Sequence, residues 1–352
     1  MIVFVVQAMN CENKEFRLEM SERLRLRDAD SDDGEHSEPE AEHADGEGGD
    51  RQEGDDVPPI LSEYADTDES VDLTHTRIYK LPDMSRFTNL ENLSARTNLL
   101  KAINTNFLCL SLLTELDLYE NQIEEIQNLQ NCVNLVKLDL SYNRIRKIKG
   151  LETLTKLTHL YLVHNKISVI EGLGTLTNLE YLELGDNRIR KIENISHLTK
   201  LQQLYLGKNK IRKIEGIETL AELTIFSISA NRLVKLENIN HLIKLEELYA
   251  SDQGLQEISG VNNMKNIKIF DISMNEIKTV GEAVELPNLE DFWANDNKIE
   301  DWAEVDKLKN LQNLSTVYLE QNPIYKKDIT GYRRKVMLAL PQVTQIDATN
   351  CK

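Results

Sequence analysis

The sequence contains little cysteine, and its four cysteines, at positions 11, 109, 132 and 351, are widely scattered. They form neither the paired clusters that flank extracellular repeats nor the Cys-x-x-Cys pairs of metal and redox sites. The sequence therefore argues against a disulfide scaffold and indicates a reducing compartment, the cytosol or the nucleus.

Long apolar runs and catalytic motifs are missing as well. The apolar start, MIVFVVQAM, is too short to span a membrane and lacks the basic region of a secretion signal. There is no Gly-rich phosphate loop, no Gly-x-Ser-x-Gly and no His pair with metal-ligand spacing. His197 and His241 stand at equivalent places in two similar segments, which indicates a structural role. We expect no enzyme, no cofactor, no metal site and no membrane segment.

A 22-residue repeat dominates the rest of the chain. Aligned on Leu-x-x-Leu-x-Leu-x-x-Asn-x-Ile, segments such as LVKLDLSYNRI and LEYLELGDNRI place the Asn at positions 121, 143, 165, 187 and 209. The same register continues through Asn231, Gln253, Asn275 and Asn297. Period and motif together predict a leucine-rich repeat solenoid of the α/β class, with a curved parallel sheet on the concave face and short 3-10 or turn segments on the convex face.

One repeat explains why each position holds its residue type. Leu138 and Leu140 alternate with Lys137, Asp139 and Ser141, so a short strand has one core side and one surface side. The Asn that follows is expected to bond backbone groups at the bend, and stacking makes a ladder of these amides. No unit buries its own apolar side, so the core forms only between stacked units.

The net charge of -18 belongs mainly to the N-terminal part of the chain. Residues 28–56 hold fourteen acidic residues and one Arg, whereas the chain from Leu73 onward has a net charge of about -1. Such a segment cannot bury enough apolar surface to fold. We expect residues 1–70 to form a disordered acidic tail, either solubilising or partner-binding, before a near-neutral solenoid.

The two ends of the solenoid depart from the repeat, as terminal repeats do. The predicted organisation is leucine-rich repeats over residues 71–325, about 11 or 12 units, and a C-terminal cap over residues 326–352. Within the cap, the apolar residues expected to cover the open core are Val336, Met337, Leu338 and Leu340.

The concave side is the candidate binding surface. The position between the two strand leucines reads Asp117, Asp139, Tyr161, Glu183, Tyr205, Ser227, Tyr249, Asp271, Trp293 and Tyr318, and the flanking row includes Tyr181, Glu247 and Asp291. An exposed row of aromatic residues suits an interface, and the acids between them imply a basic protein partner rather than nucleic acid. Solvated strand residues are the alternative. Trp293 is expected to project because its neighbours are small or polar, whereas Trp302 takes a core position.

Basic residues recur at the turns, where Arg144, Lys166, Arg188, Lys210 and Arg232 follow the ladder Asn. Acids such as Glu193 and Glu215 lie beyond Lys191 and Lys213 at the next bend. We expect a solvated edge whose charges compensate one another. The groove itself, on the order of 55 Å along a dozen stacked strands, suits a whole protein domain.

The 22-residue repeats with NRIRKIE-type turns, together with LEDFWANDNKIEDW and YRRKVMLALPQVTQIDAT near the C-terminus, resemble the leucine-rich regulatory subunits of type 1 protein phosphatase, of the regulatory subunit 7 type. The resemblance covers about residues 71–349. It implies that the concave face binds the phosphatase catalytic subunit through Asp139, Tyr161, Glu183, Tyr205, Asp271, Asp291, Trp293 and Tyr318. Tyr249 joins this set because it lies in the same row.

The resemblance further implies a non-catalytic subunit of nucleus and cytoplasm that affects the maturation, location or substrate choice of the phosphatase and is linked to chromosome segregation. On its own the chain is expected to be a monomer. The alternatives are a structural adaptor for another globular partner, such as a cytoskeletal or axonemal component, and a ribonucleoprotein scaffold.

Overall fold

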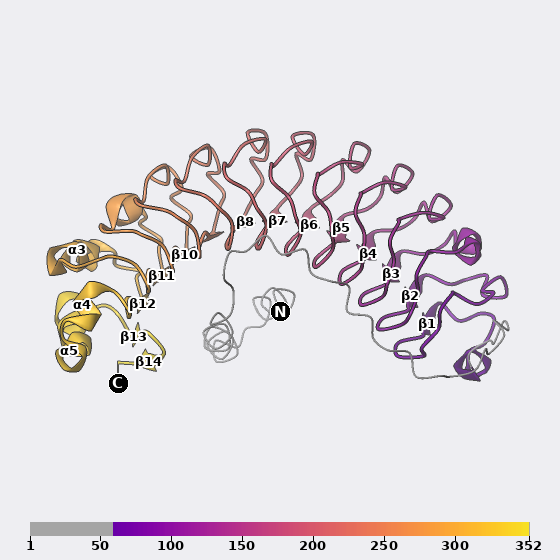
Figure 1. The fold of residues 1–352 in the computed structure, drawn as a ribbon, viewed down its shortest axis with the longest axis horizontal. Helices are drawn as coiled ribbons and strands as arrows, with labels where there is room; N and C mark the ends of the chain where they lie inside the picture. The colour runs from indigo at the N-terminus through magenta and orange to yellow at the C-terminus, as the bar shows by residue number, and fades with distance from the viewer. Residues whose placement is uncertain (1–58, 352) are drawn as a thin grey trace, which may run out of the picture. The chain divides into compact units, whose positions relative to one another are not determined.

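The computed structural model describes residues 59–351, which form one curved stack of repeats (Figure 1). The strands line the inner side of the arc, and the return segments lie on its outer side. They are β1 Ser70–Asp72, β2 Asn92–Ser94, β3 Glu115–Asp117, β4 Lys137–Asp139, β5 His159–Tyr161, β6 Tyr181–Glu183, β7 Gln203–Tyr205, β8 Ile225–Ser227, β9 Glu247–Tyr249, β10 Ile269–Asp271, β11 Asp291–Trp293, β12 Thr316–Tyr318, β13 Gln345–Ile346 and β14 Thr349–Asn350.

The sheet follows chain order, with parallel pairing from β1 to β13 and an antiparallel β13–β14 pair at the end. Each strand pairs in the register that the 22-residue period dictates, so Leu138 lies beside Leu160 and Leu160 beside Leu182. These leucines are fully buried in a single core cluster that runs along the stack. The predicted leucine-rich repeat solenoid is confirmed.

The ladder of asparagines joins successive repeats. The Asn165 amide nitrogen donates to the carbonyls of Leu140, at 3.0 Å, and Leu162, at 3.2 Å, while its oxygen accepts from the backbone nitrogen of Ile145 at 2.9 Å. The same bonds recur at the equivalent asparagines. In the one repeat without Asn, Gln253 accepts from the Leu233 nitrogen at 2.9 Å and donates to the Ile228 carbonyl.

The outer side consists mostly of turns, as expected from the short return segments. The 3-10 helices are η1 Pro59–Glu63, η2 Thr105–Cys109, η3 Gly281–Glu285 and η4 Leu308–Asn310, and a short α-helix, α3 Trp302–Lys307, precedes η4. Within the described part of the chain, no helix is both long and apolar enough to cross a bilayer.

One outer turn position demands a left-handed backbone. Gly172 has φ +70°, and a Cβ there would approach the Ile148 carbonyl oxygen to 2.1 Å. Gly150 and Gly216 occupy the same position, while the intervening repeat has Asn194 with φ 58°. The Asn194 amide donates to the Ile170 carbonyl at 2.8 Å, a bond that helps Asn tolerate this conformation.

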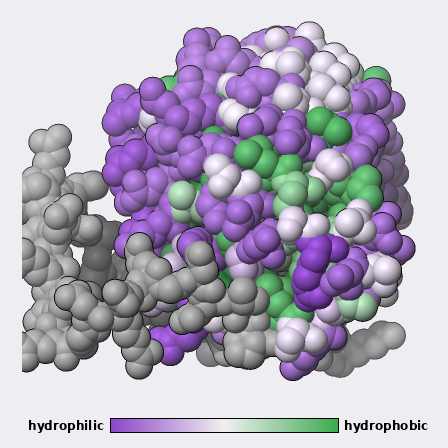
Figure 2. Space-filling model, turned by 90° about the vertical axis from the view of Figure 1, so that its right-hand side faces the viewer, coloured by the Kyte–Doolittle hydropathy of each residue, from purple (hydrophilic) through white to green (hydrophobic). Residues whose placement is uncertain are grey.

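The N-terminal end differs from the predicted boundary. The predicted tail covers residues 1–70, of which residues 1–58 lie outside the described part of the chain. The remaining part is structured, because η1 and the start of β1 both lie before residue 71. Leu61 is buried in the core, and Arg86 donates to the carbonyls of Leu61 and Tyr64. The segment from residue 59 therefore caps the first repeat. Viewed toward this end, hydrophobic side chains lie among a mostly hydrophilic surface (Figure 2).

The C-terminal cap contains α4 Pro323–Lys326, α5 Ile329–Ala339 and the β13–β14 pair. Val336 and Leu340 are buried as predicted, but Met337 is half-exposed and Leu338 is 73% exposed. Those two assignments are wrong because helical geometry puts residues four apart on one face. Tyr332, four residues before Val336, completes the buried face instead.

We predict that replacing Asn165 by Ala lowers the free energy of unfolding by about 1–3 kcal/mol, because it leaves the buried Ile145 nitrogen without its partner and removes one of the two amide donors to the Leu140 carbonyl. Denaturant unfolding measures this. The control is Asn178→Ala, which removes a single surface bond to the Thr155 carbonyl and should cost less than about 1 kcal/mol. Equal midpoints for the two variants would show that the ladder contributes little.

Candidate protein-binding face

The strand register assembles the predicted concave row. Asp139 lies beside Tyr161, Tyr161 beside Glu183 and Glu183 beside Tyr205. The column continues to the C-terminal end through Ser227, Tyr249, Asp271, Trp293 and Tyr318. Asp291, the remaining predicted residue, lies in the flanking column between Ile269 and Thr316.

The column is much less exposed than a solvated strand surface. Glu183 is only 1% exposed and Tyr205 2%, and Tyr249 and Asp271 are also buried. Asp139, Tyr161, Asp291, Trp293 and Tyr318 are half-buried. The expectation of an exposed aromatic stripe is wrong for the middle of the column, because side chains on neighbouring strands about 4.8 Å apart cover one another.

An aromatic layer causes much of this burial. The Tyr181 ring centroid lies 4.7 Å from that of Tyr161 and 5.2 Å from that of Tyr205. The His159 ring stacks on Tyr181 at 5.7 Å. Offset and tilted contacts of this kind add about 0.5–1.5 kcal/mol per pair to the burial of the rings. The layer is thus ordered before any partner arrives.

Trp293 does not project from the face as predicted. Its ring lies 6.3 Å from the Tyr249 ring and 5.8 Å from the Tyr318 ring, and its Nε1 is buried without a hydrogen-bond partner among the described residues. The prediction considered only the small or polar residues next to Trp293, whereas aromatic residues from other repeats enclose its ring. Trp302, expected in the core, is half-buried at the start of α3 with its ring 6.3 Å from that of Tyr332.

Glu183 is the most unusual acid of the face. The Tyr181 hydroxyl donates to its Oε2 at 2.9 Å, whereas Oε1 is buried and has no partner within the described part of the chain. Burial raises the pKa of Glu183 from 4.5 to about 8, although the bond from Tyr181 opposes the shift. A buried carboxylate is costly unless a cation or a donor satisfies it.

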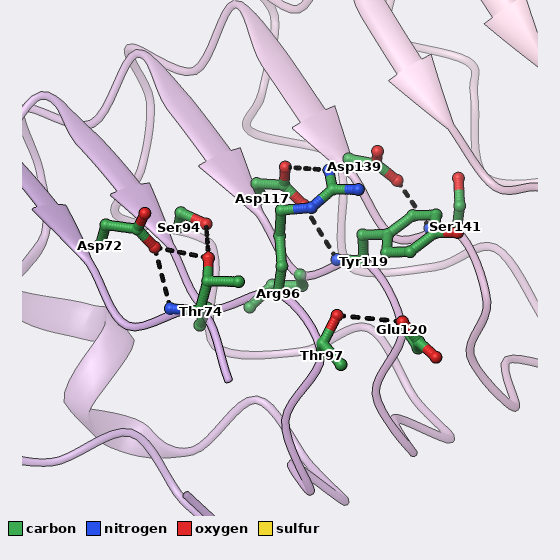
Figure 3. Close-up of polar contacts among 12 residues, drawn as sticks. Asp72, Thr74, Ser94, Arg96, Thr97, Asp117, Tyr119, Glu120, Asp139 and Ser141 are labelled. Atoms are coloured by element: carbon green, nitrogen blue, oxygen red, sulfur yellow. Dashed lines mark hydrogen bonds and ion pairs between the residues drawn. The ribbon is translucent and has the colours of Figure 1, made fainter. Parts of the chain in front are cut away.

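The N-terminal end of the column contains a smaller polar cluster (Figure 3). The Arg96 guanidinium donates to Asp117 at 2.6 Å and lies over the Tyr119 ring at 4.1 Å from its centroid. Asp139, next in the column, accepts from the Ser141 nitrogen at 2.8 Å. Burial, with a contribution from the charge of Asp117, raises the pKa of Asp139 to about 6.

The C-terminal end holds its acids differently. Asp271 accepts from the nitrogen and hydroxyl of Ser273 at 2.9 and 2.6 Å, and burial nevertheless raises its pKa. One oxygen of Asp291 is buried and has no partner within residues 59–351. The Tyr318 hydroxyl accepts from the Gln345 side chain at 3.1 Å, so β13 of the cap contributes to this end of the face.

Arg96 and Tyr119 were not predicted to belong to this face, and Tyr181 was placed in the flanking row but not among the contact residues. Tyr181 could have been chosen, since it stands at the repeat position of His159 and two residues before Glu183. Arg96 lies in the irregular first repeats, whereas Tyr119 lies in a regular repeat, at the position of Ser141 after the strand, which the predicted concave rows did not include.

Two equivalent histidines have a structural role. His197 and His241 contact the carbonyls of Leu173 and Ile217 at 2.9 and 3.0 Å, so their predicted structural role is confirmed. Among residues 59–351 there is no group of three or more His, Cys, Asp or Glu side chains placed to hold a metal ion.

Comparison with known proteins agrees with the repeat. A leucine-rich repeat model matches residues 111–153 and 155–197, and a second one matches residues 248–352. An internalin of Listeria monocytogenes has a similar structure, with a TM-score of 0.66 and 24% identity over 80% of this chain and 87% of that one. A complex of TLR13 with single-stranded RNA gives a TM-score of 0.58 and 24% identity over 78% of this chain and 46% of that one. Fold and repeat together define the chain as a leucine-rich repeat protein.

Curated relatives of the chain have more specific names. A Caenorhabditis elegans protein named protein phosphatase 1 regulatory subunit SDS22 homolog is 64% identical over 42 residues, 12% of this chain and 13% of the relative. Human protein phosphatase 1 regulatory subunit 7 is 66% identical over 38 residues, 11% of this chain and 10% of the relative. The matches therefore span about a tenth of the relatives' length. They confirm the resemblance to leucine-rich regulatory subunits of this phosphatase.

We predict that Glu183→Gln makes stability less dependent on pH, because the amide oxygen still accepts from Tyr181 while the charge is gone. A carboxyl with a raised folded-state pKa contributes stability below its unfolded pKa, and that contribution is lost as the pH rises through the folded pKa. The parent should therefore lose stability relative to the variant between pH 4.5 and about 8. Each pKa unit corresponds to about 1.4 kcal/mol. Parallel pH profiles of the unfolding free energy would contradict this.

Proposed function

We propose that the protein is a non-catalytic regulatory subunit that binds the catalytic subunit of protein phosphatase 1 through the concave face. The contact residues are Asp139, Tyr161, Glu183, Tyr205, Tyr249, Asp271, Asp291, Trp293 and Tyr318. The names of the curated relatives support the partner, and the chemistry of the column supports the face.

The observation that carries the proposal is the environment of Glu183. Its Oε1 is buried between aromatic rings and has no partner among residues 59–351, so the carboxyl group has already lost most of its hydration. An Arg or Lys side chain of a partner placed there gains a desolvated ion pair and satisfies that oxygen. Asp139 and Asp291 offer further acids on either side, which fits a partner with a row of basic residues.

The aromatic residues supply the rest of the interface. Tyr161, Trp293 and Tyr318 are half-buried, so each still presents part of a ring to a partner. Their neighbours already fix the rings, so binding requires little further ordering of these side chains. Rigid aromatic groups that a partner can fully cover are the usual centres of binding energy. Backbone phosphates of a nucleic acid would be repelled by the acids of the same column.

In the cell this activity would affect the maturation, location or substrate choice of the phosphatase, in both nucleus and cytoplasm, and would contribute to chromosome segregation. The chain would act as a monomer that joins the catalytic subunit. Capture of partners from a cell extract followed by mass spectrometry separates this function from an adaptor for cytoskeletal, axonemal or ribonucleoprotein components. Recovery of such components without the phosphatase would contradict the proposal.

We predict that Trp293→Ala weakens binding to the phosphatase catalytic subunit by about 2–4 kcal/mol, roughly 30- to 1000-fold in affinity. Because Trp293 contacts Tyr249 and Tyr318, we also expect a modest fall in melting temperature. Calorimetric titration well below the melting temperature separates the two effects.

Trp302→Ala is the matched control, since it removes the same side chain from the packing against α5 rather than from the concave face. This variant should be less stable yet bind with the parent's affinity. If Trp293→Ala also bound with the parent's affinity, the concave face would not be the docking surface.

A further inference from the structure

Five consecutive turns of the solenoid carry basic residues directly after the ladder Asn. The turns read RIRK at 144–147, KISV at 166–169, RIRK at 188–191, KIRK at 210–213 and RLVK at 232–235. These twenty positions hold twelve Lys or Arg and no acid. We call this set the basic edge.

Ten of the twelve basic side chains of the edge are exposed, and the other two, Lys166 and Lys210, are half-buried. In the first turn Ile145 is buried, while Arg144, Arg146 and Lys147 are exposed. The turns stack directly, because the Lys166 nitrogen donates to the Ile145 carbonyl and the Arg188 nitrogen to the Ile167 carbonyl, both at 2.8 Å. Similar bonds link the remaining turns. With stacked repeats about 4.8 Å apart, five turns extend for roughly 20 Å.

The expected compensation by acids is mostly lacking. Lys235 pairs with Glu237 at 2.7 Å, and Lys191 approaches Glu193 and Glu215 only to 3.9 Å. The other ten basic side chains of the edge make no ion pair or side-chain hydrogen bond with residues 59–351: Arg144, Arg146, Lys147, Lys166, Arg188, Arg190, Lys210, Arg212, Lys213 and Arg232. The prediction of a self-compensating edge is therefore confirmed at Lys191 and Lys235 and wrong for the other ten side chains.

The strip is local and narrow. The turn before it carries Glu124 and Glu125, and the turn after it carries Glu257. A row of glutamates at positions 171, 193, 215 and 237 runs along its far side. A feature required by the repeat itself would continue through those turns, so the charge is a property of these five units.

We propose that the basic edge is a second docking surface, which binds an extended acidic segment of a partner polypeptide. Seven residues of extended chain span about 20–25 Å, which matches the strip. Exposed Arg and Lys without partners among residues 59–351 can pair with Asp, Glu or phosphorylated side chains.

Other polyanions fit less well. A nucleic acid duplex, about 20 Å wide, would overlap the glutamate row beside the strip. The five turns contain no aromatic residue on which the bases of a single strand could stack. They also lack Trp and Phe, their Leu233 and isoleucines are buried in the core, and the exposed apolar side chains that could insert into a membrane surface are two isolated valines, Val169 and Val234.

The test uses the full chain and a fluorescein-labelled octaglutamate peptide, with binding followed by fluorescence anisotropy at low and physiological ionic strength. Since the whole chain has a net charge of -18, bulk attraction cannot account for binding of an acidic probe. We expect binding that weakens with salt, and a loss of about tenfold or more in affinity for the triple variant Arg146→Glu, Arg190→Glu, Arg212→Glu.

The matched control reverses the same number of charges at Lys200, Lys244 and Lys268, which lie outside the basic edge. Peptide affinity of this control should stay within about twofold of the parent. Equal loss in both variants would overturn the proposal, as would tighter binding of an eight-nucleotide single strand, or of phosphatidylserine vesicles, through the same three arginines.

This surface is separate from the concave face. The triple variant should bind the phosphatase catalytic subunit with the parent's affinity, whereas Trp293→Ala should leave peptide binding unchanged. The two proposals can therefore fail independently.

Discussion

The structure depends on the hydrogen bonds that the ladder asparagines make between repeats. Each repeat turns sharply after a three-residue strand, and the turn leaves buried backbone groups that only a neighbouring repeat can satisfy. One side chain per unit, such as Asn165, closes both its own bend and that of the preceding unit. The strand and its bend are therefore the same in every unit, whereas the return segment can lengthen: Asn322 follows Asn297 by 25 residues and still makes the ladder bonds.

Stacking at this spacing also determines the chemistry of the concave face. Side chains from adjacent strands are forced together, so Tyr181, Glu183 and Tyr205 bury one another. The result is a face whose acids are partly dehydrated and whose rings are already fixed. Such a surface is poorly hydrated, and the burial of Glu183 raises the pKa of its carboxyl group to about 8.

The solenoid separates its charges by position in the repeat. Acids gather between the strand leucines, as at Asp139 and Glu183, while Arg and Lys gather at the turns that follow the ladder. The net charge of the repeats is near zero, although they carry two surfaces of opposite sign, the negative concave column and the positive turns. Because each surface position recurs independently of the core, a solenoid can carry two such surfaces without altering its stacking.

The sequence by itself determined the repeat, the strand register, the amide ladder and the membership of the concave column, because all of these follow from residue type and period. Only the tertiary structure decided how deeply that column is buried, which rings enclose Trp293, which turn cations pair with acids of residues 59–351, and which side of α5 meets the core. These properties depend on contacts between side chains one or two repeats apart. A periodic pattern predicts which side chains are neighbours, but it does not predict their rotamers or the space left between them.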